Sequence, residues 1–208
     1  MAADDARFLQ VLQDVQAGRL SSEQALERLR YLPYEDLGYA KLDHHRGLRQ
    51  GLPEVVFGLG KSPEQLRGIL QRLSPRTDRL LVTRVDQAAW EYVRDVATDA
   101  AYHADARAIV RDSTPDTERR PGVLVVSAGT ADVPVAEEAC LTAELMGHRV
   151  ERLYDVGVAG IHRLLAHTPQ LRAANVTIVV AGMEGALPSV VAGLVDRPVI
   201  AVPTSIGY

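Results

Sequence analysis

The stretch Val123-Leu124-Val125-Val126-Ser127-Ala128-Gly129-Thr130-Ala131-Asp132 decides the fold class of this 208-residue chain. Its four consecutive apolar residues, 123–126, are typical of a strand that is buried on both faces of a sheet. A loop of small residues follows at once, and Pro134 then begins a helical pattern, since proline is favoured in the first turn of a helix. A buried strand, a short loop and a helix in this order predict an α/β protein.

The same alternation continues to the end of the chain. We predict strands at 123–126, 150–154, 176–180 and 198–202, and helices at 134–147, 161–166 and 186–195. Strands that alternate with helices imply a parallel sheet with right-handed crossovers, as in flavodoxin-like and Rossmann-like folds. The last six residues, 203–208, look like the start of another strand-to-helix loop, so we expect a C-terminal helix or more to follow them.

The N-terminal half predicts a separate, smaller unit. Two helices come first, at 4–17 and from Ser21 onward, where Ser21 and Gln24 have the spacing of a capping box. A small α/β unit follows, with strands at 53–57, 79–83 and 106–110 and helices at 87–97 and from Ser62, where Ser62 and Gln65 have the spacing of a second capping box. The charged, proline-bounded segment 112–121 is typical of a linker. We therefore predict domains at 1–115 and 116–208, the second one truncated at its C-terminus.

Composition excludes several classes of protein. The net charge of −4 and an aromatic content of 5% give no support for nucleic-acid binding. No apolar run is long enough to span a bilayer, and the N-terminus lacks the pattern of a secretory signal. Cys140 is the sole cysteine, so no intrachain disulfide can form, which is typical of a cytoplasmic protein.

Three glycine-containing loops at predicted strand ends form the candidate site. They are 127–132, 156–163 and 181–188, and they carry one acid or base each: Asp132, His162 and Glu184. Open α/β sheets bind ligands at the carboxyl ends of their strands. The three loops therefore predict a single site, in which the small loop residues let the backbone approach a substrate closely.

Each residue also has a plain structural interpretation. Asp132 lies two residues before Pro134 and could cap the helix there. A lone histidine such as His162 is usually a surface or core residue, and the loop glycines could serve positive φ angles alone. Cys140 falls on an apolar helix stripe, which indicates an inert core thiol. Glu184 is the hardest to explain structurally, because a Met-Glu-Gly loop is a poor core element.

The second half resembles the aminoimidazole-ribonucleotide carboxylase (PurE-like) domain. The first loop stands where that fold has its phosphate-binding Gly-Ser-x-Ser-Asp sequence, and His162-Arg163 stands near its catalytic His-Arg. The stretch 181–193, Ala-Gly-Met-Glu-Gly-Ala-Leu-Pro-Ser-Val-Val-Ala-Gly, matches its Ala-Gly-x-x-x-x-Leu-Pro-Gly-x-Val-Ala. Together with the N-terminal segment 43–61, which includes Asp-His-His-Arg, Pro-Glu and Gly-Lys, the whole chain resembles the LarB family of nickel-pincer cofactor biosynthesis proteins.

That resemblance implies a carboxylase/hydrolase acting on nicotinic acid adenine dinucleotide. The family adds the co-substrate CO2 to the pyridinium ring and cleaves the phosphoanhydride, giving pyridinium-3,5-biscarboxylic acid mononucleotide and AMP. It uses a nucleophilic cysteine that would lie C-terminal to Tyr208, and Cys140 is not at its position. The resemblance also implies a homo-oligomer, possibly an octamer, with sites at subunit boundaries.

The chemistry of that reaction suggests a role for each candidate. Glu184 and His162 are the expected general bases for the ring proton. Asp132 is the expected carboxylate ligand of Mg²⁺ at the phosphoanhydride. Backbone N–H groups of Gly129 and Thr130 could hold a phosphate or the substrate carboxylate at the start of the helix near Pro134. The expected substrate-binding residues are Ser127, Gly129, Thr130, Ala131, Gly182, Met183, Gly185, Arg46, Arg49 and Lys61.

Two alternatives stay open at this point. One is a purine-pathway aminoimidazole-ribonucleotide carboxylase or mutase, although the first loop lacks that family's serines and the N-terminal extension is then unexplained. The other is a nucleotide-binding assembly module without activity, because fold alone does not decide function.

Overall fold

The computed structural model of the protein describes residues 3–30, 35–44, 46 and 54–205. In the first half of the chain the elements are α1 (Ala3–Gln16), α2 (Ser22–Arg30), β1 (Glu35–Asp36), β2 (Lys41–Leu42), β3 (Val55–Phe57), α4 (Pro63–Leu73), the 3-10 turn η1 (Ser74–Arg76), β4 (Arg79–Thr83), α5 (Gln87–Val93), β5 (Ala101–His103) and β6 (Ala108–Asp112). In the second half they are η2 (Asp116–Glu118), β7 (Arg120–Ser127), η3 (Thr130–Asp132), α6 (Val133–Leu145), β8 (His148–Leu153), η4 (Val158–Gly160), α7 (Ile161–Leu165), α8 (Thr168–Ala173), β9 (Val176–Ala181), α9 (Ala186–Leu194) and β10 (Val199–Pro203).

The second half forms the expected parallel sheet. Its strand order is β10-β9-β7-β8, and every neighbouring pair is parallel. The central strand β7 contains the apolar run 123–126, in which Val125 and Val126 are fully buried. This arrangement confirms the predicted α/β class with a parallel four-stranded sheet, preceded by a smaller N-terminal unit of helices and a mixed sheet.

The N-terminal unit is built on a mixed four-stranded sheet with the order β3-β4-β6-β5. Among neighbouring strands only β3 and β4 pair in parallel; β6 pairs antiparallel with both β4 and β5. The sequence indicated a strand at 106–110, whereas β6 runs from Ala108 to Asp112, and β5 was missed. The residues of β5 are exposed or half-buried and include no apolar run, so they carry little strand signal.

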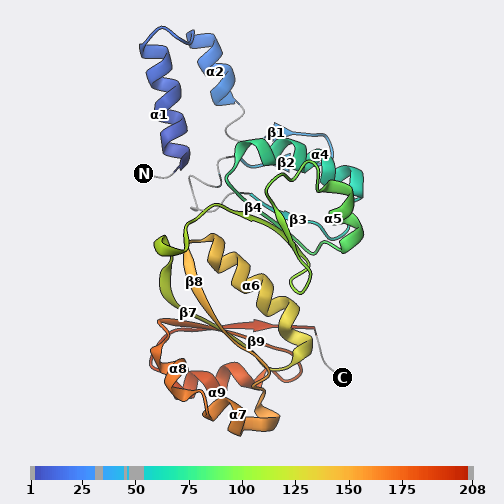
Figure 1. Cartoon of the computed structure of the whole chain (residues 1–208), viewed down its shortest axis with the longest axis vertical. Coiled ribbons are helices and arrows are strands. Elements are labelled where there is room, and N and C mark those ends of the chain that lie inside the picture. The colour runs from blue at the N-terminus through green and yellow to red at the C-terminus, as the bar shows by residue number, and fades with distance from the viewer. Residues whose placement is uncertain (1–2, 31–34, 45, 47–53, 206–208) are drawn as a thin grey trace.

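Helix α6 lies between the two sheets (Figure 1). Its Leu141 and Leu145 pack with Leu81 of β4 and Val110 of β6 in the mixed sheet. On its other side, Ala136 and Cys140 pack with valines of the parallel sheet. A helix that is apolar on two opposite sides is expected where both sides are covered. The shared helix therefore joins the two sheets through continuous cores.

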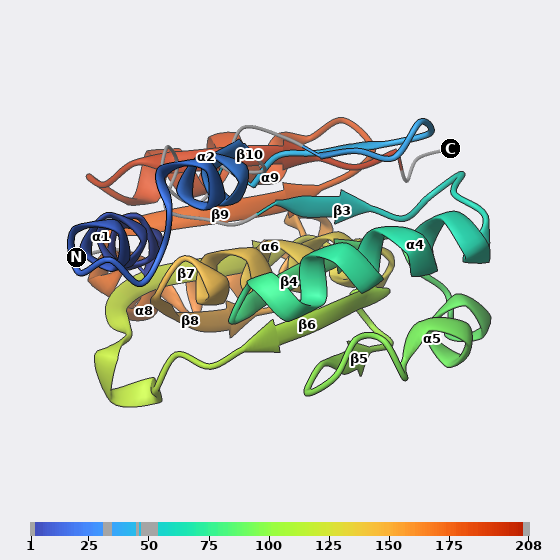
Figure 2. The ribbon, with the colours of Figure 1, turned by 90° about the horizontal axis from the view of Figure 1, so that it is seen from above.

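The outer faces of both sheets are covered by further helices (Figures 1 and 2). Helix α4 buries Leu66, Ile69, Leu70 and Leu73 against the mixed sheet. It begins at Ser62, whose side chain accepts from Gln65 N in the predicted capping box. Leu164, Leu171 and Leu187, from α7, α8 and α9, cover the far face of the parallel sheet. No helix in the described part of the chain is long and apolar enough to cross a membrane.

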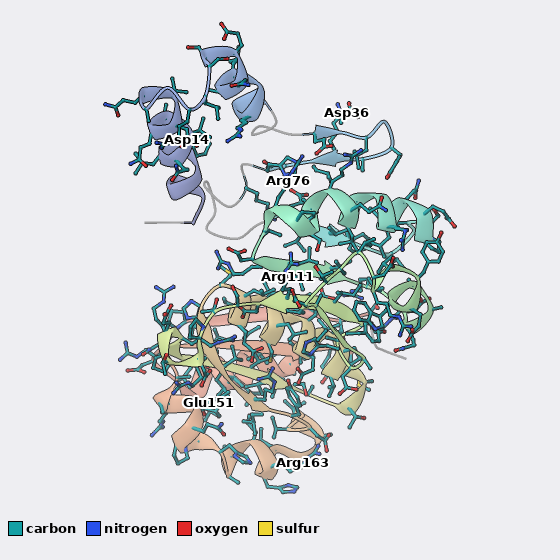
Figure 3. The ribbon with its side chains drawn as sticks, turned by 45° about the horizontal axis from the view of Figure 1, so that its top comes forward. Asp14, Asp36, Arg76, Arg111, Glu151 and Arg163 are labelled. Atoms are coloured by element: carbon teal, nitrogen blue, oxygen red, sulfur yellow. The ribbon has the colours of Figure 1, made fainter. Side chains whose placement is uncertain are left out.

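Charged contacts attach the β1–β2 hairpin to the mixed-sheet unit. The half-buried Glu35 accepts a hydrogen bond from Arg76 Nη1 at 2.7 Å, and His44 Nε2 lies 3.3 Å from the same carboxylate. Figure 3 shows Arg76 beside this hairpin. Burial raises the pKa of Glu35, but the hydrogen bonds from Arg76 and His44 outweigh it, so the pKa lies below its ordinary value.

The connection between the sheets is shorter than the predicted linker at 112–121. Strand β6 ends at Asp112 and β7 begins at Arg120, so both ends of that segment belong to strands. Between them, Arg119 Nη2 donates to the Asp112 carboxylate at 2.7 Å. The charge and proline content of 112–121 indicated a linker. In the structure this ion pair joins the two ends of the connection between β6 and β7.

Candidate functional site

The loops at the carboxyl ends of the parallel strands are joined to one another by backbone hydrogen bonds. Ala128 N donates to Val180 O at 3.0 Å, which attaches the loop after β7 to the end of β9. Gly157 N donates to Ala128 O at 2.8 Å, and Thr204 N donates to Ala181 O at 3.0 Å. Loops from all four strands therefore meet at one end of the sheet, where ligands bind in open α/β folds.

Asp132 holds two parts of this end together. Its side chain is buried; Oδ2 accepts from Gly129 N at 3.0 Å, and Oδ1 accepts from Thr204 Oγ1 at 2.7 Å. It does not cap α6, because its carboxylate bonds to no N–H of that helix. Thr204 was absent from the sequence prediction, and no local pattern could have paired it with a residue 72 positions away.

Glu184 lies on the loop after β9. Its side chain is exposed and has no hydrogen-bond or ion-pair partner among the described residues. The neighbouring Met183 has a φ of 52° and Gly185 a φ of 64°. A left-handed conformation is unusual for a residue with a side chain, and such conformations gather at functional sites. The loop thus presents a carboxylate to solvent beside two left-handed residues.

Ser127 and Arg163 both contact Asp155, which lies in the loop after β8. The fully buried Ser127 accepts from Asp155 N at its Oγ, over 3.4 Å. Asp155 itself has a φ of 59°, and its carboxylate accepts from Arg163 Nη1 at 2.6 Å. In this arrangement Ser127 and Arg163 both hold the loop, whereas the sequence indicated Ser127 as a substrate contact.

A close approach of two backbones explains one loop glycine. A Cβ added to Gly157 would lie 2.7 Å from Ala128 O, well inside any real contact of a Cβ atom. Glycine is used where backbones come this close. The first and second loops can therefore meet only because residue 157 has no side chain.

His162 lies in α7, next to the same loops, but is exposed. Within the described residues its ring has no hydrogen-bond or ion-pair partner, so nothing orients it toward Glu184. Its role as a base stays a prediction from sequence.

The first loop offers N–H groups for an anion, though not the full set expected. Gly129 N–H is already bonded to Asp132. Thr130 and Ala131 begin the turn η3, and their N–H groups have no acceptor among the described residues. Such N–H groups at the start of a helical segment favour negative charge. Anion binding at this loop stays a prediction from the sequence.

The residues present do not fit the expected Mg²⁺ ion. Both oxygens of Asp132 already accept hydrogen bonds, and no group of three or more metal-ligating side chains occurs in the described ranges. Mg²⁺ prefers several oxygen ligands in octahedral geometry. No step is therefore derived through a metal ion.

The N-terminal basic residues lie in a different layer. Lys61 belongs to the loop between β3 and α4, and its Nζ donates to Phe57 O at 2.7 Å. Arg46 N donates a hydrogen bond to Asp43 O at 3.4 Å. Arg49, together with Gly47, falls outside the described residues. Both of these hydrogen bonds lie within the N-terminal unit, and the substrate contacts of Arg46 and Lys61 stay predictions.

Cys140 is a core thiol of α6. It is fully buried, and its Sγ lies 3.4 Å from Tyr154 Oη. Burial raises the pKa of the Cys140 thiol to about 11, and the hydrogen bond between Cys140 and Tyr154 opposes this only in part. Since the thiolate is the reactive form, Cys140 is unsuited to be a nucleophile.

Comparison with known proteins assigns both halves of the chain. Residues 34–113 match the LarB/PurE-like N-terminal domain, and residues 122–207 match the AIR carboxylase family. An uncharacterized protein of Methanocaldococcus jannaschii is 37% identical over 202 residues, which cover 92% of this chain and 78% of that protein. Both domain types occur here in the order that the sequence resemblance implied. The chain therefore belongs to the LarB-like family, in which a LarB/PurE-like N-terminal domain precedes an AIR carboxylase domain.

Proposed function

We propose that this protein carboxylates the pyridinium ring of nicotinic acid adenine dinucleotide with CO2 and hydrolyses its phosphoanhydride, releasing pyridinium-3,5-biscarboxylic acid mononucleotide and AMP. Membership of the LarB-like family supports a carboxylase-type enzyme. The observation that carries the proposal is the exposed carboxylate of Glu184, which has no partner among the described residues and follows β9 at the same end of the parallel sheet at which Thr130 and Ala131 follow β7.

Carboxylation of this ring requires four events: addition of a nucleophile, attack on CO2, loss of a proton and expulsion of the nucleophile. A pyridinium is electron-poor, so a nucleophile must first add to it before a ring carbon can attack CO2. The new C–C bond leaves a proton on that carbon, and a base must remove it. Expulsion of the nucleophile then restores the aromatic ring. Glu184 is our candidate for the base, because an exposed carboxylate on a ligand-facing loop can accept this proton.

The amides of the first loop have a separate task. Thr130 N–H and Ala131 N–H can hold a phosphate or the ring carboxylate of the substrate. Held there, the anion keeps the dinucleotide in one orientation while Glu184 acts, and the same contacts stabilise charge when water cleaves the phosphoanhydride. The buried Asp132 sets the shape of this turn through its bond to Gly129 N.

The nucleophile is not Cys140. Its thiol is buried and its pKa is raised to about 11, so the thiolate is scarce at neutral pH. The nucleophilic cysteine that the family resemblance implies is a different residue, and turnover is accordingly assayed with the whole protein.

Ligand-induced stabilisation tests the substrate class without requiring turnover. Nicotinic acid adenine dinucleotide, NAD⁺ and aminoimidazole ribonucleotide are compared, and a true ligand at a hundredfold excess over Kd stabilises by about 2.7 kcal/mol. We expect the largest increase of melting temperature with the nicotinate dinucleotide. Stabilisation by aminoimidazole ribonucleotide alone would instead favour the purine-pathway alternative, which the match to the AIR carboxylase family keeps as the second candidate.

Glu184→Gln tests the base directly. We expect dinucleotide binding to persist and the formation of the carboxylated product to fall by about 10²–10⁴-fold, the usual contribution of a general base. Glu151→Gln, an exposed carboxylate of β8, is the matched control and should retain activity. Wild-type product formation by Glu184→Gln would rule out this role, and a lack of binding by any ligand would favour an assembly module.

A further inference from the structure

Thr204 connects three strand ends of the candidate site. It follows β10 directly, and its N–H donates to Ala181 O at the end of β9. Its Oγ1 donates to Asp132 Oδ1 at 2.7 Å, in the turn that follows β7. Because β9 lies between β7 and β10, the bond between Thr204 and Asp132 crosses the carboxyl end of β9.

The loop with Glu184 leaves the sheet at this position. Residues 182–185 follow β9 directly, and within this loop Gly185 N donates to Gly182 O at 2.9 Å. Met183 adopts a left-handed conformation, which is costly for a residue with a Cβ. Because the Glu184 side chain has no partner among the described residues, only the backbone of this loop determines where its carboxylate lies.

We propose that Thr204 is a positioning residue for Glu184. By donating to the buried Asp132 carboxylate, it fixes the turn after β7 relative to the end of β9. The loop with Glu184 is thereby held next to the amides of Thr130 and Ala131. Thr204 itself touches no reacting atom. The role assigned to Glu184 rests on the proposed function, whereas the bracing of the loop does not.

Two substitutions at residue 204 isolate the hydroxyl group. Thr204→Val keeps the shape of the side chain and removes the donor, and Thr204→Ser keeps the donor. Thr177→Val is the matched control, because Thr177 of β9 is fully buried and its Oγ1 has no hydrogen-bond partner among the described residues. It removes a buried threonine hydroxyl from the same sheet without breaking a bond.

The first measurement is hydrogen exchange at the amides of Gly129 and Gly185. Loss of a hydrogen bond to a charged acceptor is large enough for about a tenfold change in a local equilibrium. We expect exchange at both amides to be about tenfold faster in Thr204→Val and unchanged in Thr204→Ser and Thr177→Val. In an Asp132→Ala background, Thr204→Val should add nothing, since the two residues then no longer interact.

The second measurement is steady-state turnover of the dinucleotide by the full-length protein. We expect Thr204→Val to lower kcat about tenfold with KM nearly unchanged, because Glu184 is misplaced while the anion-binding amides remain, and Thr204→Ser to restore kcat. A merely structural role would instead lower the melting temperature and leave kcat of the folded protein intact.

The two measurements separate this inference from the proposed function. Unchanged exchange in Thr204→Val, or an equal effect of Thr204→Ser, overturns the positioning role. Faster exchange with wild-type kcat also overturns it, because the loop would then be braced without effect on Glu184. If the wild-type protein does not turn over the dinucleotide, the proposed function fails, and the exchange data still decide whether Thr204 braces the loop.

Discussion

The two sheets on either side of α6 end in different ways. In the parallel sheet every strand delivers its carboxyl end to the same edge, where the loops that carry Asp132 and Glu184 follow β7 and β9. In the mixed sheet, β6 runs antiparallel to β4 and β5, so its carboxyl end lies at the opposite edge from those of β3, β4 and β5. The comparison teaches that strand direction, rather than composition, gathers polar loops into a site.

Charged side chains form ion pairs in both units, and Glu184 is an exception. In the N-terminal unit Glu35 is bonded to Arg76 and lies beside His44, and Arg111 donates to the carbonyl oxygens of Ser74, Thr77 and Thr98. In the parallel-sheet unit Glu184 is exposed and without a partner among the described residues. Partnered charges stabilise a fold, whereas an unpartnered carboxylate remains available for chemistry.

The largest expected effect comes from the helix that both sheets share. Leu145 of α6 is 1% exposed and packs against the mixed sheet. Leu145→Ala should lower the free energy of unfolding by about 2–5 kcal/mol, because it leaves a cavity. Chemical denaturation followed by circular dichroism measures this. Leu165→Ala, at a residue that is 47% exposed, is the control and should change little. Two separate transitions in the wild-type protein would show that α6 does not couple the sheets.

The pH dependence of stability should report on Cys140, which lies on the side of α6 that packs against the parallel sheet. Burial raises the pKa of Cys140 to about 11, above the value of an unfolded thiol, so its contribution is complete below pH 8 and is lost as the pH rises toward 11. Relative to Cys140→Ala, the wild-type protein should lose about 2–3 kcal/mol of unfolding free energy between these pH values. A constant difference between the two proteins over this range would contradict a buried, neutral thiol.

The contact between the first two loops should be sensitive to a single methyl group. Gly157→Ala places a Cβ 2.7 Å from Ala128 O, and we expect it to cost about 1–3 kcal/mol and to weaken dinucleotide binding. Gly193→Ala in α9 meets no atom within 4 Å and should stabilise the helix by up to about 1 kcal/mol. Calorimetric titration of both variants with the dinucleotide measures the change in binding. Equal binding by both would mean that the close approach does not shape the site.

The smallest effect is expected in the N-terminal unit. Arg76→Gln removes the donor to Glu35 and should cost about 0.5–1 kcal/mol, because the pair is partly exposed. Since the pKa of Glu35 is lowered, the difference from wild type should be present at neutral pH and should disappear as the pH falls below about 4. Dinucleotide binding should stay unchanged. Weaker binding would connect this cluster to the site across α6.

Sequence patterns predicted the parallel sheet and the position of its loops well. The apolar run 123–126 and its counterparts in β8, β9 and β10 lie in the expected strands. The N-terminal unit was harder, since the short β5 and the β1–β2 hairpin have no apolar periodicity. The capping box at Ser62 was predicted correctly because it depends on residues only three positions apart.

The chain's own sequence determined which loops lie at the carboxyl ends of the parallel strands, since glycines and small residues directly follow buried strands, and it determined the family. Only the tertiary structure decided what those loops do. In the folded protein Asp132 is hydrogen-bonded to Thr204 rather than to the helix that Asp132 precedes, and Arg163 is paired with Asp155. The reason is physical: strands and caps depend on neighbours along the chain, whereas partners across a sheet depend on strand order, which no local pattern encodes.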